Sequence, residues 1–214
     1  MAFYYGLMTS LDRWVVENVF KIIAQCMTRQ DPRPMAMCAI NLSGNTIGDD
    51  DFLVFLRQQF VTYAVPPEMI CFEITETSAI SNLASAIKFI NELKDLGCHF
   101  SLDDFCAGMS SFAYLKHLPV DFLKIDGSFV KDMLDDPINR AMVEVINHIG
   151  HVMGKRTIAE FVETPQIEQA LLEIGVDYAQ GYIIQRPQLF TCDSLQSRPA
   201  RPRPLLFKAP GTFR

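Results

Sequence analysis

The feature that most constrains this fold is a repeated alternation between short apolar runs and segments with helical periodicity. Apolar runs of strand length cover residues 35–43, 69–76, 98–105, 120–127, 155–162 and 176–184. The pattern predicts helices over residues 11–27, 50–63, 86–97, 111–117, 139–153 and 165–175. Apolar strands separated by helices are typical of a parallel sheet that helices cover. The sequence therefore predicts an α/β protein built from βα repeats.

Two architectures fit these repeats, a TIM-like (β/α)8 barrel and a doubly wound open sheet. The chain has 214 residues, which is short for the barrel, since about 250 residues are typical. Polar residues lie at or near the carboxyl ends of the predicted strands, namely Asn41, Glu73, Asp103, Asp104, Lys124, Glu160 and Gln180. A barrel gathers all these ends at one opening, whereas an open sheet spreads them along an edge. We therefore expect the barrel.

Composition excludes some classes of protein. A net charge of −6 and a pI near 5.2 argue against a general DNA- or RNA-binding protein, which would carry a basic face. No run reaches the roughly 18 apolar residues of a membrane span, and the start lacks the pattern of a signal peptide. We therefore expect a soluble protein of the cytoplasm.

The cysteines follow no metal-binding spacing and include no CxxC pair. Six are present, at positions Cys26, Cys38, Cys71, Cys98, Cys106 and Cys192. Several fall in apolar, strand-like runs, so we interpret them as buried free thiols in a reducing compartment rather than as disulfides.

The character of the chain changes near residue 191. Residues 191–214 combine arginine with proline and show no periodicity, so we expect a disordered tail after a single domain that covers residues 1–190. A solvated terminus is the simpler interpretation of its basic residues, although nucleic-acid or membrane contact is the alternative.

The strand-end residues predict a metal site. Carboxylate and amide oxygens suit Mg²⁺ or Mn²⁺, whereas zinc and copper prefer His and Cys. Asp103 and Asp104 can contact two cations, and a two-metal site stabilises both the attacking and the leaving oxygen in phosphoester hydrolysis. Lys124 can neutralise a phosphate, or act on a water if its surroundings lower its pKa.

Each of these signals has a simpler interpretation when it is taken alone. A pair of aspartates at a strand end is usually a turn or a helix cap, and Asn41 with Ser43 can cap a helix. Glu73, Lys124 and Glu160 can be surface charges. Only their shared placement at successive strand ends predicts a metal-dependent site, and that placement names no substrate.

Several ordered motifs resemble the EAL family of cyclic-di-GMP phosphodiesterases. They are NLS (41–43), EITE (73–76), DDFCAGMSS (103–111), LKID (123–126), AEFVET (159–164) and QGY (180–182). Their order and separations match that family over residues 1 to about 190. The resemblance implies a TIM-like barrel that cleaves cyclic-di-GMP to linear pGpG with two Mg²⁺ or Mn²⁺ ions.

The resemblance also implies roles for individual residues. The implied metal ligands are Asn41, Glu73, Asp103, Asp104 and Glu160, the last also being catalytic. Lys124 would contact the catalytic water or a phosphate, and Gln180 would hold the water and metal environment. Glu76 would anchor the loop after Asp104, which couples metal binding to homodimer formation in that family. Glu163 would lie near a guanine.

Three departures from the family pattern stand out. Cys106 and Phe161 replace usual glycines, and neither change removes a ligand. The Glu-Ala-Leu motif itself is missing, so the resemblance implies a chain that starts after the first two barrel strands, with about six strands, a lost metal-binding glutamate and impaired chemistry. Similar domains often follow a GGDEF or sensory domain, which we expect upstream in the full-length parent.

Two other classes compete with the enzyme hypothesis. A degenerate EAL domain would bind cyclic-di-GMP or dock a partner without turnover. A different metal-dependent barrel, such as an enolase-type enzyme, also sets carboxylates and a lysine on strand ends. Hydrolysis, binding without turnover, and proton exchange on a carboxylate substrate distinguish the three.

Overall fold

Six parallel strands form one sheet in the computed structural model, which describes residues 2–28, 37–106 and 113–192. The strands are β1 (Cys38–Leu42), β2 (Ile70–Thr75), β3 (His99–Phe105), β4 (Phe122–Ile125), β5 (Arg156–Ala159) and β6 (Tyr178–Ala179). Each pairs in parallel with the next one along the chain, so the spatial order equals the sequence order.

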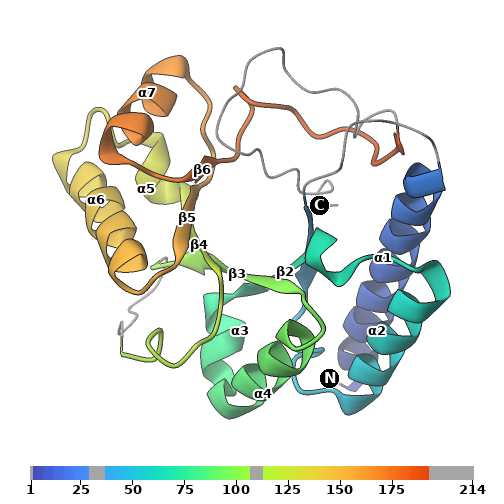
Figure 1. Cartoon of the computed structure of the whole chain (residues 1–214). Helices are drawn as coiled ribbons and strands as arrows, with labels where there is room; N and C mark the ends of the chain where they lie inside the picture. The colour runs from blue at the N-terminus through green and yellow to red at the C-terminus, as the bar shows by residue number, and fades with distance from the viewer. Residues whose placement is uncertain (1, 29–36, 107–112, 193–214) are drawn as a thin grey trace.

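Helices connect the strands and lie around the outside of the sheet (Figure 1). They are α1 (Ala2–Thr28), α2 (Asp50–Tyr63), α3 (Glu76–Ser81), α4 (Leu83–Lys94), α5 (Gly127–Lys131), α6 (Pro137–Val152) and α7 (Pro165–Ile174), with a 3₁₀ turn η1 at Pro67–Met69. This arrangement confirms the predicted TIM-like barrel type with six strands. Among the described residues β1 and β6 stand at the two ends of the sheet and do not pair with each other.

Local sequence explains where the longer helices begin and end. Asp49, Asp136 and Thr164 cap α2, α6 and α7, since the side chain of each accepts a backbone N–H of the first turn. Pro137 and Pro165 open α6 and α7, at a position where a missing N–H costs nothing. The core between helices and strands is rich in fully buried phenylalanines, among them Phe20, Phe52, Phe72, Phe89, Phe100 and Phe105.

The same aspartate contact occurs twice at the amino ends of the strands. The sequence VDF starts β4 and VDY starts β6. Asp121 accepts the backbone N–H of Phe100 in β3 at 2.9 Å, and Asp177 accepts that of Thr157 in β5 at 2.8 Å. Each aspartate therefore ties the start of its own strand to the preceding one.

Two local predictions are wrong. The helix predicted over residues 111–117 is a series of turns in its described part, Ala113–His117, and Pro119 disfavours the helical backbone just before it. The helix predicted over residues 11–27 starts earlier, at Ala2, so Asp12 lies inside α1 rather than in its first turn. Its buried carboxylate instead accepts hydrogen bonds from the Ser43 N–H and hydroxyl, at 3.0 and 2.6 Å, and from the Thr46 hydroxyl.

The cysteine prediction is wrong for two of the six residues. Cys26 in α1 and Cys192 after β6 form a disulfide, with Cα atoms 5.3 Å apart. The thiols of Cys38, Cys71, Cys98 and Cys106 are free, and the first three are buried. Sequence spacing cannot show this pairing because 166 residues separate the partners.

Two further predictions concern the ends of the chain and the membrane. Most of the predicted tail, residues 193–214, lies outside the described residues. None of the helices that the structure describes is both long and apolar enough to cross a membrane.

Candidate metal centre

One ammonium group joins three of the predicted carboxylates. Lys124 Nζ lies 2.7 Å from Asp103 Oδ1, 2.7 Å from Glu160 Oε1 and 3.4 Å from Glu73 Oε2. Glu73 belongs to β2, Asp103 to β3 and Lys124 to β4, while Glu160 directly follows β5. Four consecutive strands therefore deliver their polar side chains to one place, as the strand-end argument predicted.

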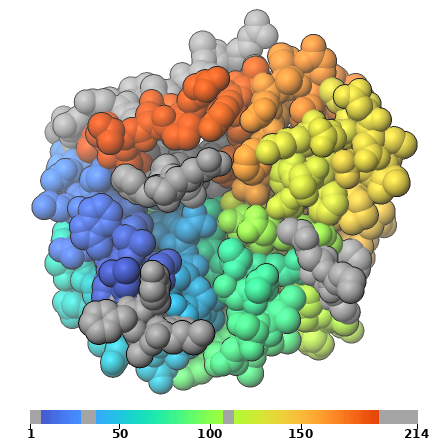
Figure 2. Space-filling model, turned by 180° about the vertical axis from the view of Figure 1, so that it is seen from behind, coloured from blue at the N-terminus to red at the C-terminus, as the bar shows by residue number. Residues whose placement is uncertain are grey.

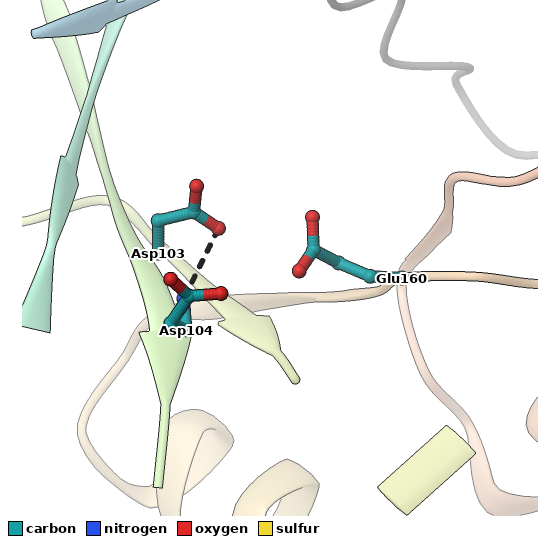
Figure 3. A group of neighbouring side chains, drawn as sticks. All are labelled: Asp103, Asp104 and Glu160. Atoms are coloured by element: carbon teal, nitrogen blue, oxygen red, sulfur yellow. Dashed lines mark hydrogen bonds between the residues drawn. The ribbon is translucent and has the colours of Figure 1, made fainter. Parts of the chain in front are cut away.

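A β-bulge places both neighbouring aspartates at this centre. In a regular strand, successive side chains point to opposite faces. The pairing of β3 with β4 shifts between Leu102 and Phe105, and Asp104 has a left-handed backbone with φ of 53°. A bulge re-aims side chains in this way. Figure 3 shows Asp103 and Asp104 side by side and facing Glu160, with the Asp104 N–H donating to Asp103 Oδ1 at 3.1 Å.

The electrostatics of the cluster follow from burial and from Lys124. Burial disfavours the charge of Lys124, but Glu73, Glu160 and Asp103 together raise the pKa of its ammonium group well above its usual value. Burial and the neighbouring Asp103 raise the pKa of Glu160 to about 7, although Lys124 opposes the shift. Burial likewise raises the pKa of Glu73. Lys124 is therefore a fixed cation in this arrangement, and its surroundings do not favour the role of a base.

Asp126 is a member of the site that the sequence reasoning missed. Burial, the charge of Asp103, and the charge and hydrogen bond of Asp126 raise the pKa of Asp104. Asp126 follows β4 and caps α5, accepting the Ser128 N–H at 2.8 Å. The strand-end rule that selected Asp103 and Glu160 applies equally to this residue and was the signal that could have found it.

The residues present fit a divalent cation. Asp103, Asp104 and Glu160 each offer a carboxylate oxygen, and these oxygens lie within 4.8 Å of one another. Within the described part of the chain, Glu73 Oε1 in the cluster and Gln180 Oε1 just after β6 are buried oxygens without a hydrogen-bond partner. Buried acceptors without partners are costly, and a cation would satisfy them. All these donors are hard oxygens of the kind that Mg²⁺ and Mn²⁺ prefer.

The two predicted amides lie on the outer strands. Asn41 is exposed on β1 and stands in register with Glu73 of β2. Gln180 follows β6, where its N–H donates to the Ala159 carbonyl at 2.8 Å, directly before Glu160. Asn41 is therefore paired with Glu73 of the carboxylate cluster, and Gln180 is bonded to the residue before Glu160. The two amides nevertheless stand at opposite ends of the sheet.

The two remaining predicted residues, Glu76 and Glu163, lie outside the carboxylate cluster. Glu76 is buried at the start of α3, where its carboxylate accepts the Cys106 N–H at 3.0 Å and the hydroxyl of Tyr114. These two contacts flank residues 107–112, so most of the predicted loop, and with it the predicted dimer contact, lies outside the described residues. Glu163 is exposed before α7 and does not join the carboxylate cluster.

Cys106 and Phe161, at the two positions where the resemblance implies glycine, both have left-handed backbones. Cys106 has φ of 67° and Phe161 has φ of 53°, a region that favours glycine and strains bulky side chains. The Phe161 ring packs so closely on Gly127 that a Cβ there would lie 2.0 Å from Phe161 Cδ2, and Lys131 Nζ lies 4.0 Å from the ring centre. The chain thus accommodates Phe161 through a glycine and a cation–π contact.

Comparison with known proteins agrees with this geometry. The family model described as EAL domain matches residues 2–187. The chain is 38% identical over 200 residues to the cyclic di-GMP phosphodiesterase PdeB of Shewanella oneidensis, covering 92% of this chain and 23% of that protein. It is 35% identical over 188 residues to the cyclic di-GMP phosphodiesterase PdeF of Escherichia coli, covering 88% and 25%. The chain thus spans about a quarter of the length of these curated relatives.

Solved structures show the same fold. The PaMucR phosphodiesterase in complex with c-di-GMP has a TM-score of 0.81 at 26% identity, over 91% of this chain and 77% of that one. The FimX EAL domain of Pseudomonas aeruginosa, bound to c-di-GMP, has a TM-score of 0.78 at 32% identity, over 86% and 73%.

Proposed function

The chain belongs to the EAL domain family, and on this premise we propose that it hydrolyses cyclic-di-GMP to linear pGpG with two divalent cations. The observation that carries the proposal is the convergence of Glu73, Asp103 and Glu160 on Lys124, with Asp104 beside them. Relatives named cyclic di-GMP phosphodiesterases support the same substrate.

The proposed cations are Mg²⁺ or Mn²⁺. Their ligands in this proposal are Asn41, Glu73, Asp103, Asp104 and Glu160. A pair of such ions supplies charge stabilisation to both the attacking and the leaving oxygen of a phosphodiester. The bulge at Asp103 and Asp104 supports this assignment, because it lets neighbouring residues serve two adjacent positions.

The chain's own residues then orient the substrate. The Lys124 ammonium, held by three carboxylates, is placed to bind a phosphate oxygen or the attacking water. Gln180 would position that water through its unpartnered Oε1. Glu76 would hold both ends of the loop after Asp104 through Cys106 and Tyr114, and Glu163 would lie near a guanine.

We propose that turnover by this chain alone is impaired. The tripeptide Glu-Ala-Leu occurs nowhere in its sequence, so the glutamate that the family motif supplies is absent from these 214 residues. A second proposal is therefore cyclic-di-GMP binding without hydrolysis, which the missing motif glutamate favours, and the FimX EAL domain bound to c-di-GMP supports the same ligand. For the parent protein we propose a cytoplasmic domain that follows a GGDEF or sensory domain and forms a homodimer through the loop after Asp104.

An Asp103→Asn variant tests the site. In a version extended upstream to include the Glu-Ala-Leu motif, Asp103→Asn removes a carboxylate that contacts Lys124 and should lower cyclic-di-GMP hydrolysis by about 100-fold or more. It should also weaken Mn²⁺ binding, while the fold persists. Chromatography of pGpG measures turnover, and Mn²⁺ titration by electron paramagnetic resonance measures binding.

Asp132→Asn, a matched change at an exposed residue after α5, should alter neither readout. Normal turnover in the Asp103 variant would remove this residue from the site. Tight dinucleotide binding by the wild type without any pGpG would favour the binding module.

A further inference from the structure

Phe161 combines a strained backbone with a position directly beside the carboxylate cluster. It follows Glu160, whose Oε1 lies 2.7 Å from Lys124 Nζ, and its φ of 53° lies in the left-handed region. A bulky residue is disfavoured there, whereas glycine is not. Strain of this kind is common at ligand-binding sites, where the surrounding structure maintains it. The aromatic ring should therefore contribute something that glycine at this position could not.

The ring of Phe161 is covered from one side by α5. A Cβ at Gly127 would lie 2.0 Å from Phe161 Cδ2, so the ring rests on the backbone of that helix, and Lys131 Nζ lies 4.0 Å from the ring centre. Gly127 and Lys131 are four residues apart in α5 and therefore lie on the same side of it. Phe161 nevertheless remains 49% exposed. The ring thus presents an apolar surface to solvent on the side away from α5.

Packing alone does not account for an aromatic side chain at this position. The largest phenylalanines of the core are less than 2% exposed, and Val162, the next residue, is fully buried. A half-exposed ring gains correspondingly less from burial. Its contact with exposed Lys131 adds only a modest attraction. Contact with a ligand would give the exposed side of the ring a role.

The exposed ring stands between two segments that carry residues of the site. On one side is Glu160, which Figure 3 shows facing Asp103 and Asp104. On the other side, Gly127 directly follows Asp126, whose charge and hydrogen bond reach Asp104. The ring therefore flanks the carboxylate cluster where β4 and β5 end. A ligand whose phosphate is held at the cluster can place its remaining part against this ring.

We propose that Phe161 stacks on a purine base of the ligand, and so favours a nucleotide over phosphodiesters that carry no aromatic base. This inference deepens the proposed function and rests on it. Aromatic side chains bind bases by stacking, because every base has a flat π-face. Lys131 holds the ring from the α5 side through the cation–π contact and leaves its other side for the base. Glycine cannot make this contact, so it distinguishes this chain from the pattern that the resemblance implies.

Affinity measurements on the full chain separate stacking from packing. Phe161→Leu keeps an apolar side chain on Gly127 but cannot stack, so cyclic-di-GMP affinity in Mn²⁺ should fall about 10-fold, whereas Phe161→Trp should retain it. Mn²⁺ affinity and Tm should stay close to those of the wild type in both variants. Unchanged or tighter dinucleotide binding by Phe161→Leu would overturn the proposal. An equal loss of Mn²⁺ affinity would also overturn it, since the ring would then act on the cluster and not on the base.

Trp14→Leu is the matched control for Phe161→Leu. Trp14 is 54% exposed and belongs to α1. Figure 2 shows the blue atoms of α1 on the opposite side of the molecule from the yellow atoms around α5 and α6. Removing this exposed aromatic ring should leave cyclic-di-GMP affinity unchanged. An equal loss in the control would contradict a specific role for Phe161.

Fluorescence of the double variant Trp14→Phe, Phe161→Trp tests the stacking itself, because residue 161 then carries the sole tryptophan of the sequence. Cyclic-di-GMP and GMP should quench this fluorescence, whereas ribose 5-phosphate, which has no base, should not. Cyclic-di-GMP binding without quenching would overturn the stacking and leave the proposed function intact. Quenching by GMP without cyclic-di-GMP binding by the wild type would support the stacking and count against the proposed function. Neither binding nor quenching would overturn both.

Discussion

The central strands and the outer strands of this sheet hold their polar residues in different ways. Strands β2 to β5 bring three carboxylates to one buried ammonium group, Lys124, and their backbones pair without interruption apart from one bulge. Strands β1 and β6 each pair on one side only, Asn41 lies on β1 and Gln180 follows β6, and a disulfide joins the helix before β1 to the segment after β6. The carboxylate cluster on the central strands is therefore held by its own ion pairs with Lys124. The outer strands depend more on contacts outside the sheet, such as the Asp12 hydrogen bonds to Ser43 and the disulfide.

The strongest way to break the centre is Lys124→Ala. In metal-free buffer, this change leaves the negative charges of buried Glu73 and its neighbours without a compensating positive charge. The free energy of unfolding should therefore fall by about 3–5 kcal/mol. Chemical denaturation measures the loss, and Mn²⁺ should restore part of it by taking the place of the ammonium charge.

Lys88→Ala is the matched control for that variant. Lys88 forms exposed ion pairs with Asp50 and Glu92, and such pairs contribute little, so no measurable change is expected. Equal stability of the Lys124 variant and the wild type in metal-free buffer would show that the carboxylates do not need the Lys124 ammonium group.

A smaller effect should follow from crowding the β6 edge with Gly181→Ala. A Cβ at residue 181 would lie 2.2 Å from the Val162 carbonyl oxygen and 2.3 Å from its nitrogen, both parts of the backbone. The Val162 N–H donates to the Gln180 carbonyl, so the added methyl group should push this edge away from β5 at a cost of about 1–3 kcal/mol.

Gly154→Ala gives the reference for that experiment. A side chain at residue 154 would be strained by the positive φ of 70°, but its Cβ would meet no atom within 4 Å. Its cost should stay near 1 kcal/mol. Urea unfolding of both variants measures the difference, and an equal loss would mean that contact with Val162 is harmless.

The smallest expected effect concerns pH and Asp177 at the amino end of β6. Although partial burial opposes it, hydrogen bonds from Thr157 and His151 lower the pKa of Asp177. Because the folded pKa lies below the unfolded value of about 3.9, this stabilisation is present above pH 4 and is lost as the pH falls through the folded pKa.

Asp177→Asn should therefore lower the free energy of unfolding by about 1 kcal/mol at pH 7, a small amount because solvent screens this partly exposed group. The loss should become progressively smaller below pH 4, where the wild-type carboxylate is itself protonated. Urea unfolding across pH 2–7 measures the trend. A cost that does not shrink in acid would assign the role of Asp177 to hydrogen-bond geometry rather than to charge.

Much of this fold could be predicted from the sequence because its signals are local. Apolar runs with helical segments between them indicate the strands, and polar residues at their ends indicate the site, so the convergence of Glu73, Asp103 and Glu160 was predictable. The predicted helix over 50–63 agrees with α2 at both ends. These features follow from patterns among residues that are close together in the sequence.

The features that escaped prediction depend on distant contacts. The bulge that turns Asp104 toward the site follows from the pairing of β3 with β4, which sequence spacing does not show. The Cys26–Cys192 bond and the burial of Asp12 against Ser43 and Thr46 each join residues far apart in the chain. Local periodicity contains no information about such pairs.

The identity between strand order and sequence order also bears on how the protein is made. Each described strand after β1 pairs with the one synthesised just before it, so the sheet can grow in one direction as the polypeptide leaves the ribosome. Cys192 emerges only after all six strands, while Cys26 emerges before the first. Their covalent bond can therefore form only on a chain that has been translated beyond β6, so it records that all six described strands have been made.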